Sequence, residues 1–411
     1  MAVAHQGRLS LVRSGAAPAA AAIDQQRIAA LTADLVRFPT QGGIDPQAPA
    51  LHYLADWLDQ AGVPSRLYEA PNRRPKNRAI GLLAEIGPPR GPAFALTACL
   101  DTAVFGEPDT WEGCKPTAAL VTDGWMVGRG TADSKVGVAI FCMLMAELRP
   151  IAHTLQGRLL LLLDSDEHTG RFGAVKQLTA EQNHIKGVYI GYPGNGSIKI
   201  GARGFYRAKV SLYGVSSHSG ASQPSRQNAV EKAARLVTAL TAAPLPDADD
   251  TSDFGIGPQK TCTAITGGRG YSSVPDYCFL RVDYRLTPTF TKAVARQHLR
   301  ALVEEVDRQM PTDRASRIEA EQSWPAYRLG AGDALVRALR DAAAAEFGTP
   351  PELQVSGPSN VGIFLSSFGI DATCGFGVTC RNVHGANEAI KLDTIMPVYR
   401  SYRAAVLKLL T

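Results

Sequence analysis

Residues 158–170 read RLLLLLDSDEHTG, and both the fold and the functional site can be approached from this stretch. Its five consecutive leucines form a short apolar run that ends in a polar cluster. Such a run is typical of a strand buried on both faces of a sheet. In α/β proteins, ligands bind at the carboxyl ends of the strands, where acidic residues and a histidine follow here. The stretch therefore predicts an α/β domain with a functional site at the end of this strand.

The same pattern extends outward from this strand. Further short apolar runs occur at residues 80–86, 93–100 and 188–190. Residues 135–148 form an apolar segment of helical length, and hydrophobic residues recur at helical spacing around 28–36 and 51–58. This alternation predicts a central mixed sheet flanked by helices.

The chain length of 411 residues exceeds the roughly 250–300 at which a single hydrophobic core stops growing, so two domains are expected. After Gly201 the pattern changes to that of a compact α+β unit. This unit has predicted strands at 206–213, 261–266 and 278–284 and predicted helices at 228–242 and 291–309.

After Ser323 the first pattern resumes, with a predicted helix at 333–347, a strand at 370–376 and a final helix at 394–410. The second unit is therefore interpreted as an insertion into the first. The predicted organisation is a flexible leader at 1–22, a first domain at 23–202 that resumes at 323–411, and an inserted domain at 203–322.

Composition excludes several classes of protein. Hydrophobic residues make up 45% of the chain, and no segment approaches the roughly 18 consecutive apolar residues of a membrane span. The net charge of +5 comes without a Lys/Arg block, which suits a small anionic substrate better than nucleic acid. Seven irregularly spaced cysteines argue against a disulfide framework. Residues 1–22 lack the continuous apolar core of a secretory signal, so a cytoplasmic location is expected.

Four further polar clusters are TACLDT at 97–102, GRGTADSK at 128–135, GYP at 191–193 and NVHGANE at 382–388. Each has a purely structural interpretation when taken alone. Asp133 is placed to cap the helix that follows it, the tip at 164–170 is typical of a solvated turn, and a lone histidine such as His384 is usually a surface residue. The glycine-rich turn lacks the spacing of a P-loop or a dinucleotide-binding fingerprint.

Together and in this order, the five clusters resemble the metallohydrolase family of glutamate carboxypeptidase, aminoacylase, acetylornithine deacetylase and succinyl-diaminopimelate desuccinylase. The resemblance begins near Ala29 and runs to the C-terminus. It includes GVSSHS at 214–219 and QNAV at 227–230, which are similar to the family's dimerisation-domain signature, and VPD at 274–276 and DYR at 283–285, which are similar to its later strands.

This resemblance implies a zinc-exopeptidase-like catalytic domain with an inserted α+β dimerisation domain. It also implies a hydrolase that cleaves a C–N bond of a small carboxylate-bearing molecule with one or two divalent metals. The chain would then associate as a homodimer or a higher homo-oligomer through the inserted domain.

The metal ligands follow from matching the family motifs. Asp133 matches the Asp that bridges the family's two metals, His168 stands at the second acid of a Glu-Glu pair, and His384 matches a late histidine. Two imidazoles and a carboxylate with open positions suit Zn, Mn, Fe or Co. The second pocket has Cys99 in place of a histidine and Tyr192 in place of an acid. We therefore expect one divalent transition metal per chain.

Cys99 and Tyr192 leave alternatives open. A cysteine can bind a soft ion and a tyrosine can ligate as phenolate, although both residue types more often pack or form hydrogen bonds. Tyr192 is also a candidate for a removable ligand or for a hydrogen-bond donor to substrate. The three-ligand set by itself also describes the facial triad of iron oxygenases, an assignment that the fold resemblance opposes.

The resemblance also gives roles to residues that do not bind metal. Glu167 stands at the family's general base and would pass a proton from metal-bound water to the leaving nitrogen, while metal-bound hydroxide attacks the substrate. Asp101 matches the Asp that supports a metal-ligating histidine, but Cys99 replaces that histidine, so this supporting role is open. His218 would reach the partner's active site across a dimer and stabilise negative charge there.

Three residues are candidates for binding substrate. Arg285 can grip a carboxylate bidentately. Ser272 stands where the family usually has Asn, and Asn360 stands where it usually has Asp. The substrate pocket therefore departs from the family pattern together with the metal site.

The loss of one metal pocket bears on the substrate, because the family normally polarises a peptide carbonyl with two metals. We predict an aromatic-amine aminohydrolase that releases ammonia, as in the family branch that converts 5-nitroanthranilate to 5-nitrosalicylate. The alternatives are an N-acyl amino acid deacylase or dipeptidase, and a catalytically inactive relative that binds a ligand or serves as an assembly subunit. Retention of four residues together argues against the inactive relative: Glu167, Asp133, His384 and His218.

Overall fold

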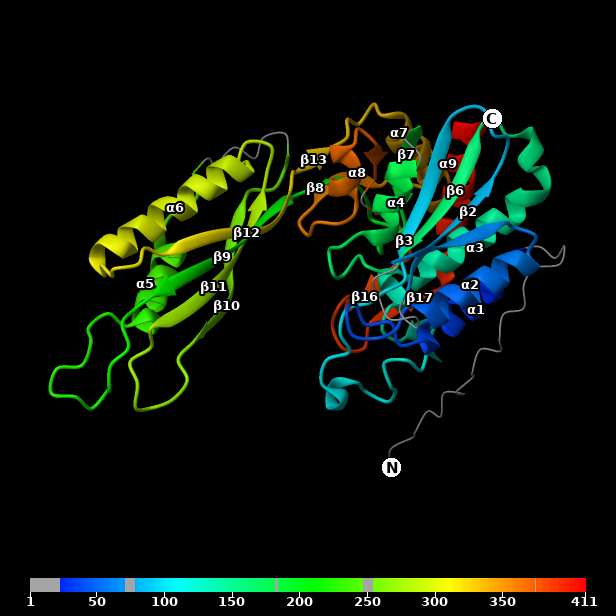
Figure 1. Cartoon of the computed structure of the whole chain (residues 1–411). Helices are drawn as coiled ribbons and strands as arrows, with labels where there is room; N and C mark the ends of the chain where they lie inside the picture. The colour runs from blue at the N-terminus through cyan, green and yellow to red at the C-terminus, as the bar shows by residue number, and fades with distance from the viewer. Residues whose placement is uncertain (1–22, 71–77, 182–183, 247–253, 374) are drawn as a thin grey trace. The chain divides into compact units, whose positions relative to one another are not determined.

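The computed structural model describes residues 23–70, 78–181, 184–246, 254–373 and 375–411, so the predicted leader at 1–22 lies outside the described residues. The described chain divides into two compact units (Figure 1). Unit 1 comprises Met1–Ile200, Leu329–Gln354 and Asn360–Thr411, and unit 2 comprises Gly201–Arg328 and Val355–Ser359. The domain limits expected from the sequence, 203 and 322, fall a few residues inside unit 2.

A six-stranded mixed sheet forms the centre of unit 1, in the order β1-β2-β6-β3-β7-β15 (Figure 1). Its strands are β1 (Ser65–Glu69), β2 (Ala79–Ile86), β6 (Arg158–Asp164), β3 (Ala93–Cys99), β7 (Ile185–Ile190) and β15 (Asp371–Ala372). β3 runs parallel to β6 and β7, whereas β2 runs antiparallel to β6. The five leucines of β6 are at most 2% exposed, because both faces of the sheet are covered. The expected mixed sheet is confirmed.

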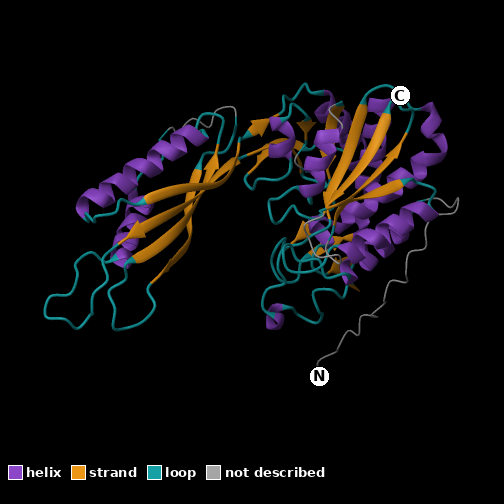
Figure 2. Cartoon of the chain, viewed as in Figure 1, coloured by secondary structure: helices purple, strands orange, loops and turns teal. Residues whose placement is uncertain are grey.

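Helices flank this sheet (Figure 2). They are α1 (Gln25–Arg37), α2 (Ala48–Gln60), α3 (Val136–Leu148), α4 (Gly173–Glu181), α7 (Ala334–Phe347), α8 (Gly362–Ser367) and α9 (Ile395–Leu410). Side-chain caps begin two of them, because Asp24 accepts a hydrogen bond from Arg27 N and Asp333 accepts one from Leu335 N. The segment Thr131–Thr154 is long and apolar enough to cross a membrane, but 67% of its apolar window is buried in the structure, around α3.

A smaller sheet in unit 1 positions the site. Its order is β16-β17-β5-β4, with β16 (Cys380–Arg381), β17 (Ala389–Lys391), β5 (Trp125–Val127) and β4 (Leu120–Thr122). β17 pairs antiparallel with β5, with Ala389 opposite Val127. This pairing brings the 382–388 loop beside the glycine-rich turn that follows β5, although the two lie far apart in the sequence. The described residues of unit 1 also include short helical turns: η2 (Pro108–Thr110), η3 (Thr131–Lys135), η4 (Arg149–Thr154) and η5 (Leu392–Thr394).

Unit 2 is a four-stranded antiparallel sheet with two helices on one face (Figure 2). The strands are β10 (Gln259–Gly267), β11 (Tyr277–Leu286), β9 (Gly204–Tyr213) and β12 (Arg317–Trp324), and the helices are α5 (Ala229–Ala242) and α6 (Lys292–Gln309). Alternate residues of the central strands pack with the apolar faces of the helices in one core. Three short strands, β8 (Ser197–Ala202), β13 (Tyr327–Arg328) and β14 (Glu352–Ser356), form a further sheet where the chain passes between units.

Two expectations about strands need correction. The predicted strand at 370–376 is reduced to β15, because Gly375 approaches Tyr192 too closely for a side chain and its carbonyl bonds Lys199 N rather than continuing the ladder. β12 was not predicted, because its sequence RIEAEQSW is polar and shows no alternation. It is an edge strand held by its ladder to β9 rather than by buried side chains.

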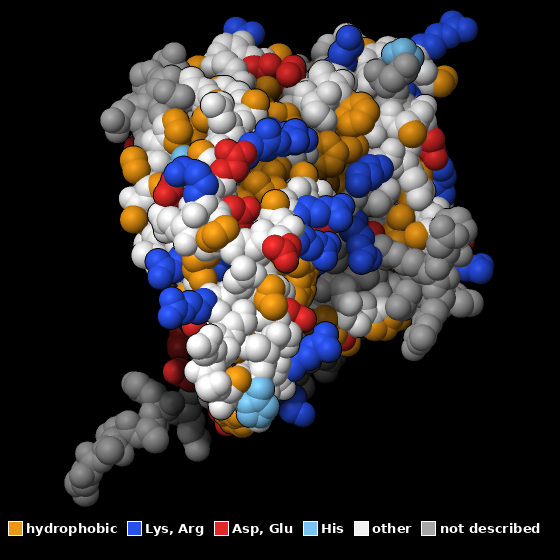
Figure 3. All heavy atoms as spheres, turned by 60° about the vertical axis from the view of Figure 1, so that its left-hand side comes forward, with side chains coloured by type: hydrophobic (Ala, Val, Ile, Leu, Met, Phe, Trp, Pro, Cys, Tyr) orange, Lys and Arg blue, Asp and Glu red, His pale blue; other side chains and the backbone are white. Residues whose placement is uncertain are grey.

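The surface is mixed in charge on the face drawn in Figure 3. Lys and Arg side chains there are interspersed with Asp, Glu and hydrophobic side chains.

Candidate active site

Two parallel strands deliver the first candidate residues to one edge of the sheet. β3 and β6 are in register, with Cys99 opposite Asp164, and Leu100 N donates to Asp164 O at 2.8 Å. The segments that follow them carry Asp101 on one side and Glu167 with His168 on the other. The sheet edge therefore collects two of the sequence clusters, as the strand-end rule predicts.

Asp133 reaches the same place from the glycine-rich turn. Gly130 has φ +82°, and a Cβ there would lie 2.5 Å from Thr102 Cγ2, so the turn requires glycine. The Asp133 side chain is 3% exposed. The turn leads into α3, but the Asp133 carboxylate faces His384 and does not cap the helix.

His384 lies in a loop of residues 382–388, which we call the His384 loop. The loop connects β16 to β17 and holds Asn382, His384 and Asn387 at positive φ values of 54°, 63° and 57°. Left-handed backbone is uncommon for residues other than glycine and clusters at functional sites. The loop therefore needs contacts outside itself to hold this conformation.

Asp133, His168 and His384 bring three candidate ligand atoms together. His384 Nε2 lies 2.8 Å from Asp133 Oδ2, His168 Nε2 lies 3.8 Å from the same oxygen, and the two Nε2 atoms are 3.3 Å apart. Around a tetrahedral metal with bonds of about 2.0–2.1 Å, ligand atoms lie about 3.3–3.4 Å from one another. The observed separations scatter around this value, so the three residues fit a divalent transition metal.

The charges around His168 also favour a cation. Its Nδ1 has no partner at hydrogen-bonding distance, but carboxylate oxygens of Asp101 and Glu167 each lie 3.6 Å away. Burial lowers the pKa of His168, and these carboxylates together with Asp133 raise it to about 9. For Asp133, burial acts in the opposite direction and raises the pKa. The two imidazoles outweigh this effect and lower the pKa of Asp133 overall. A bound metal would satisfy the same demand for positive charge by displacing the proton from His168.

Asp101 acts mainly on the main chain. It is fully buried, and its carboxylate accepts hydrogen bonds from Glu167 N at 3.2 Å and from His168 N at 2.9 Å. It therefore holds the segment that presents both side chains. The family resemblance left the role of Asp101 open, because Cys99 stands in place of the histidine that the matching Asp supports. In the structure the hydrogen bonds of Asp101 are with the main chain of residues 167 and 168.

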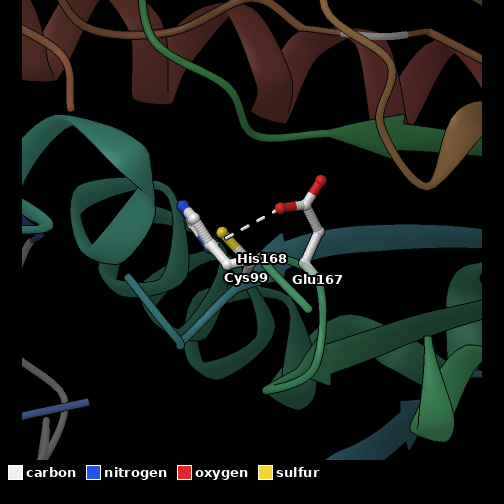
Figure 4. A group of neighbouring side chains, drawn as sticks. All are labelled: Cys99, Glu167 and His168. Carbon is white, nitrogen blue, oxygen red and sulfur yellow. Dashed lines mark ion pairs between the residues drawn. The ribbon is translucent and has the colours of Figure 1, made fainter. Parts of the chain in front are cut away.

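Glu167 lies beside His168 (Figure 4). Tyr192 makes a second contact with its carboxylate. Tyr192 Oη donates to Glu167 Oε1 at 2.8 Å, and the other carboxylate oxygen faces His168. Burial raises the pKa of Glu167 to about 7, with His168 and Tyr192 opposing the rise and Asp133 and Asp101 adding to it. A carboxyl group with a pKa near neutrality can both accept and return a proton.

Cys99 borders the other side of Asp133. Its Sγ lies 3.4 Å from Asp133 Oδ1 and 3.2 Å from Ser134 Oγ, and the Ser134 hydroxyl also bonds the main chain of Cys99. Burial, with the nearby acids adding to it, raises the pKa of the Cys99 thiol well above its ordinary value. Cys99, Glu167 and His168 form a second possible metal-binding group that shares His168 with the first (Figure 4).

The remaining candidates lie on separate elements. In unit 2, His218 is exposed and its main chain forms a β-bridge with Ser273. Ser272 O also accepts a hydrogen bond from Ser219 N at 3.1 Å. The loops that carry His218 and Ser272 are therefore neighbours. In unit 1, Asn360 is buried and its Oδ1 accepts from Gly362 N at 2.9 Å, at the start of α8.

Arg285 belongs to a charged cluster in unit 2. Its Nε lies 2.7 Å from Asp283 Oδ2 and its Nη1 donates to Ser359 Oγ, while Arg207 Nε bonds the other oxygen of Asp283 at 3.1 Å. Two guanidiniums share one carboxylate, so the cluster carries excess positive charge. An anionic ligand is a suitable partner for such a cluster.

The sequence analysis gave no role to Arg129, Glu388 or Ser134. Arg129 and Glu388 form a buried ion pair between the turn of Asp133 and the His384 loop. The sequence did hold one signal. The two segments that must meet at the site each carry one charge, Arg129 in the glycine-rich turn and Glu388 in the His384 loop, and the two charges are opposite in sign. Neither charge has a family motif role in the sequence, and their pairing depends on the β5 and β17 register.

Comparison with known proteins identifies the family of the chain. A profile of peptidase family M20/M25/M40 matches residues 95–408. Succinyl-diaminopimelate desuccinylase of Paracoccus denitrificans is 25% identical over 392 residues, covering 91% of this chain and 96% of that protein.

Solved structures share the fold. An M20 family metallo-carboxypeptidase from Sulfolobus solfataricus superposes with a TM-score of 0.74 at 17% identity, covering 92% of this chain and 98% of that one. A dinuclear metal-binding M20 peptidase from Bacillus subtilis gives a TM-score of 0.67 at 16% identity, covering 94% and 98%. The family resemblance inferred from the motifs is thereby confirmed: the chain belongs to peptidase family M20/M25/M40 and is a metal-dependent hydrolase of C–N bonds.

Proposed function

We propose that this enzyme works with a single divalent transition metal, Mn, Zn, Co or Fe, held by Asp133, His168 and His384. The observation that carries the proposal is the convergence of Asp133 Oδ2 with the two Nε2 atoms, 2.8 and 3.8 Å from it. Two imidazoles and one carboxylate leave coordination positions open for water and substrate. When bound, the metal supplies Lewis acidity and lowers the pKa of a coordinated water.

By the motif match, Cys99 and Tyr192 stand at the family's second metal position. Both side chains make other contacts here. The Cys99 thiol lies against Ser134 Oγ and Asp133 Oδ1, and Tyr192 Oη donates to Glu167. The group of Cys99, Glu167 and His168 would compete with the first set for His168. A single ion uses His168 once and leaves Glu167 free to act as a base.

Glu167 then serves as the general base. It receives the proton of the attacking water and returns it to the leaving nitrogen. Tyr192 holds one oxygen of the carboxylate, so the other oxygen is oriented toward the metal ligands. The pKa of Glu167, about 7, suits proton transfer in both directions near neutral pH.

The substrate we propose is an aromatic amine that carries a carboxylate. Water adds to the ring carbon, the C–N bond breaks and ammonia leaves, so that an aryl amine and water give a phenol and ammonia. Electron-withdrawing substituents, as in 5-nitroanthranilate, stabilise the negative charge on the ring. A ring electrophile does not require the second metal that polarises a peptide carbonyl. Arg285 is the residue we propose for the substrate carboxylate, and Ser272 and Asn360 stay separate candidates for substrate contacts.

A second candidate is hydrolysis of an N-acyl amino acid or a dipeptide with the same metal and the same base. The relatives favour it, since several that cover most of this chain are named succinyl-diaminopimelate desuccinylase. The two candidates differ in the leaving group. The aromatic reaction releases ammonia without a carboxylic acid, whereas amide hydrolysis releases an acid together with an amine.

We also propose that unit 2 joins two copies of the chain. His218 supports this, because it is exposed on a loop of unit 2 and its Nδ1 accepts only a local bond from Gly220 N. Light scattering of the full chain tests the oligomer. A cytoplasmic location stays a prediction from the sequence.

One experiment tests the proposed function. The protein is reconstituted with Mn, Zn or Co, the metal content per chain is measured by elemental analysis, and three substrates are assayed: 5-nitroanthranilate, an N-acetyl amino acid and N-succinyl-diaminopimelate. One metal with ammonia from the first substrate supports the proposal. Acetate or succinate release selects the amide hydrolase, a metal content of two makes Cys99 and Tyr192 ligands, and no metal with no turnover indicates an inactive relative.

A further inference from the structure

A buried ion pair joins the two chain segments that carry Asp133 and His384. Arg129 Nη1 donates to Glu388 Oε2 at 2.8 Å, and the side chains are 2% and 0% exposed. The two residues are 259 positions apart in the sequence. Arg129 belongs to the turn of Asp133, and Glu388 ends the His384 loop.

Each member of the pair also binds the main chain near the ligand carried by the other segment. Glu388 Oε1 accepts hydrogen bonds from Ala132 N at 2.9 Å and from Asp133 N at 3.1 Å. Arg129 Nη2 donates to His384 O at 3.1 Å. The contacts cross over, so a shift of either segment would break bonds to both ligands.

The pair is sheltered, and its loop needs support. Trp111 packs over the guanidinium of Arg129 at 5.5 Å, and the side chain of Asn387 bonds Glu112 N and Thr110 O. His384 itself has φ +63°, a conformation that a histidine adopts only when its surroundings hold it. Charge-assisted hydrogen bonds in a water-excluded place are suited to do this.

We infer that Arg129 and Glu388 are positioning residues that set the affinity of the metal site. They touch no reacting atom, and they act by fixing the main chain at Asp133 and at His384. The inference rests on the proposed metal ligands, and it assigns the control of metal affinity to a pair outside the ligand set. Changes in residues that orient metal ligands typically cost about 10–100-fold in affinity.

The test uses the full chain and Co²⁺ as the probe. Glu388→Gln keeps the shape and can still accept from Ala132 N and Asp133 N, but it removes the charge that faces Arg129. We expect Co²⁺ affinity, measured against a competing chelator, to fall by about 10–100-fold, and the visible Co²⁺ absorption to change as ligand geometry loosens. Arg129→Lys keeps the charge but loses the second arm that reaches His384 O, and a smaller loss is expected.

Lys232→Met provides the matched control. Lys232 is 1% exposed and pairs with the partly exposed Asp307 at 2.7 Å in unit 2, so its loss breaks an ion pair whose basic member is buried. We expect it to lower the thermal midpoint of the metal-free protein while leaving Co²⁺ affinity and absorption unchanged.

The outcomes separate the inference from the metal site itself. Wild-type protein that binds no Co²⁺ would overturn both the proposed site and this inference. Wild-type binding with unchanged affinity and spectrum in folded Glu388→Gln and Arg129→Lys would overturn the inference alone. If Glu388→Gln does not fold, Arg129→Lys decides, because a folded variant with wild-type affinity contradicts the role we assign.

Discussion

The two sides of the Asp133 carboxylate differ sharply in chemistry. Oδ2 faces His384 Nε2 at 2.8 Å and His168 Nε2 at 3.8 Å, whereas Oδ1 faces the Cys99 thiol at 3.4 Å. One side offers nitrogen lone pairs to a cation. The other offers a thiol and the Ser134 hydroxyl, which satisfy each other by hydrogen bonding. One buried acid therefore borders a metal pocket on one side and a neutral wall on the other.

Under the proposed single-metal site, this difference would set the number of metals without a change of fold. The chain has the fold of its family. By the motif resemblance it carries Cys99, His168 and Tyr192 at three positions where the family usually has other metal ligands. A thiol whose pKa is raised well above its ordinary value stays protonated near neutral pH. A second ion would have to displace the proton of this thiol and its contacts with Ser134 Oγ and Asp133 Oδ1.

The largest effect is expected from removing the shared acid. Asp133→Ala takes the carboxylate from both sides and leaves two imidazoles, so we expect metal content to fall to near zero. Activity should fall by more than the roughly 10–100-fold that changes around ligands cost. Elemental analysis after reconstitution measures the first quantity and ammonia release the second.

Asp307→Asn in unit 2 is the control for a lost ion-pair acid, and it should keep full metal content. Unchanged metal binding in folded Asp133→Ala would remove Asp133 from the ligand set. The comparison between its two sides would then lose its basis.

Glu167→Gln comes next and separates chemistry from binding. The amide keeps the shape of the side chain and a contact to Tyr192 but cannot take a proton. We expect activity to fall by about 10²–10⁴-fold while the metal content stays at the wild-type level. Loss of metal in this variant would instead make Glu167 a ligand, as the group of Cys99, Glu167 and His168 allows.

The sequence predicted the parts of this site that local pattern controls. The leucine run of β6, the glycine turn before α3 and the motif order brought Asp133, His168 and His384 into one hypothesis, and the structure brings their side chains together. Four strands of the central sheet, β2, β3, β6 and β7, were predicted because they are apolar runs that the fold buries. The partly exposed β1 was not predicted. β12 was missed because an edge strand is held by main-chain hydrogen bonds, which a polar sequence does not reveal.

Contacts set by tertiary register were beyond reach of the sequence. The bond from Tyr192 to Glu167 depends on where β7 ends relative to β6, and these strands are not neighbours in the sheet. The Arg129–Glu388 pair depends on the pairing of β5 with β17. Neither contact has a fixed spacing that a motif could record.

The next prediction converts the wall into a pocket. Cys99→His with Tyr192→Asp restores the two ligand types that the family resemblance assigns to the second metal. We expect metal content to rise from about one to about two ions per chain, and activity on the aromatic amine to fall relative to amide substrates. Each single variant is the control and should stay near one ion. A folded double variant with one ion would mean that side chains at 99 and 192 do not set the metal count.

The smallest effect concerns the pH dependence, through the contact between Tyr192 and Glu167. A base acts in its deprotonated form, so activity should rise with pH as Glu167 loses its proton, around its pKa of about 7. The Tyr192 hydroxyl donates to the carboxylate and lowers this pKa. Tyr192→Phe removes the donor, so the pKa of Glu167 should rise and the acidic limb of the pH profile should move to higher pH.

The profile of kcat/KM against pH measures this shift, and activity below the limb should fall by about tenfold, as expected for a hydrogen bond to a charged group. Tyr189→Phe is the matched control, because Tyr189 is also buried but its hydroxyl donates to Leu335 O rather than to an acid. Its profile should coincide with that of the wild type. If Tyr192→Phe leaves the acidic limb in place while metal content is unchanged, then Glu167 is not the group that sets this limb, and Tyr192 contributes nothing to proton transfer.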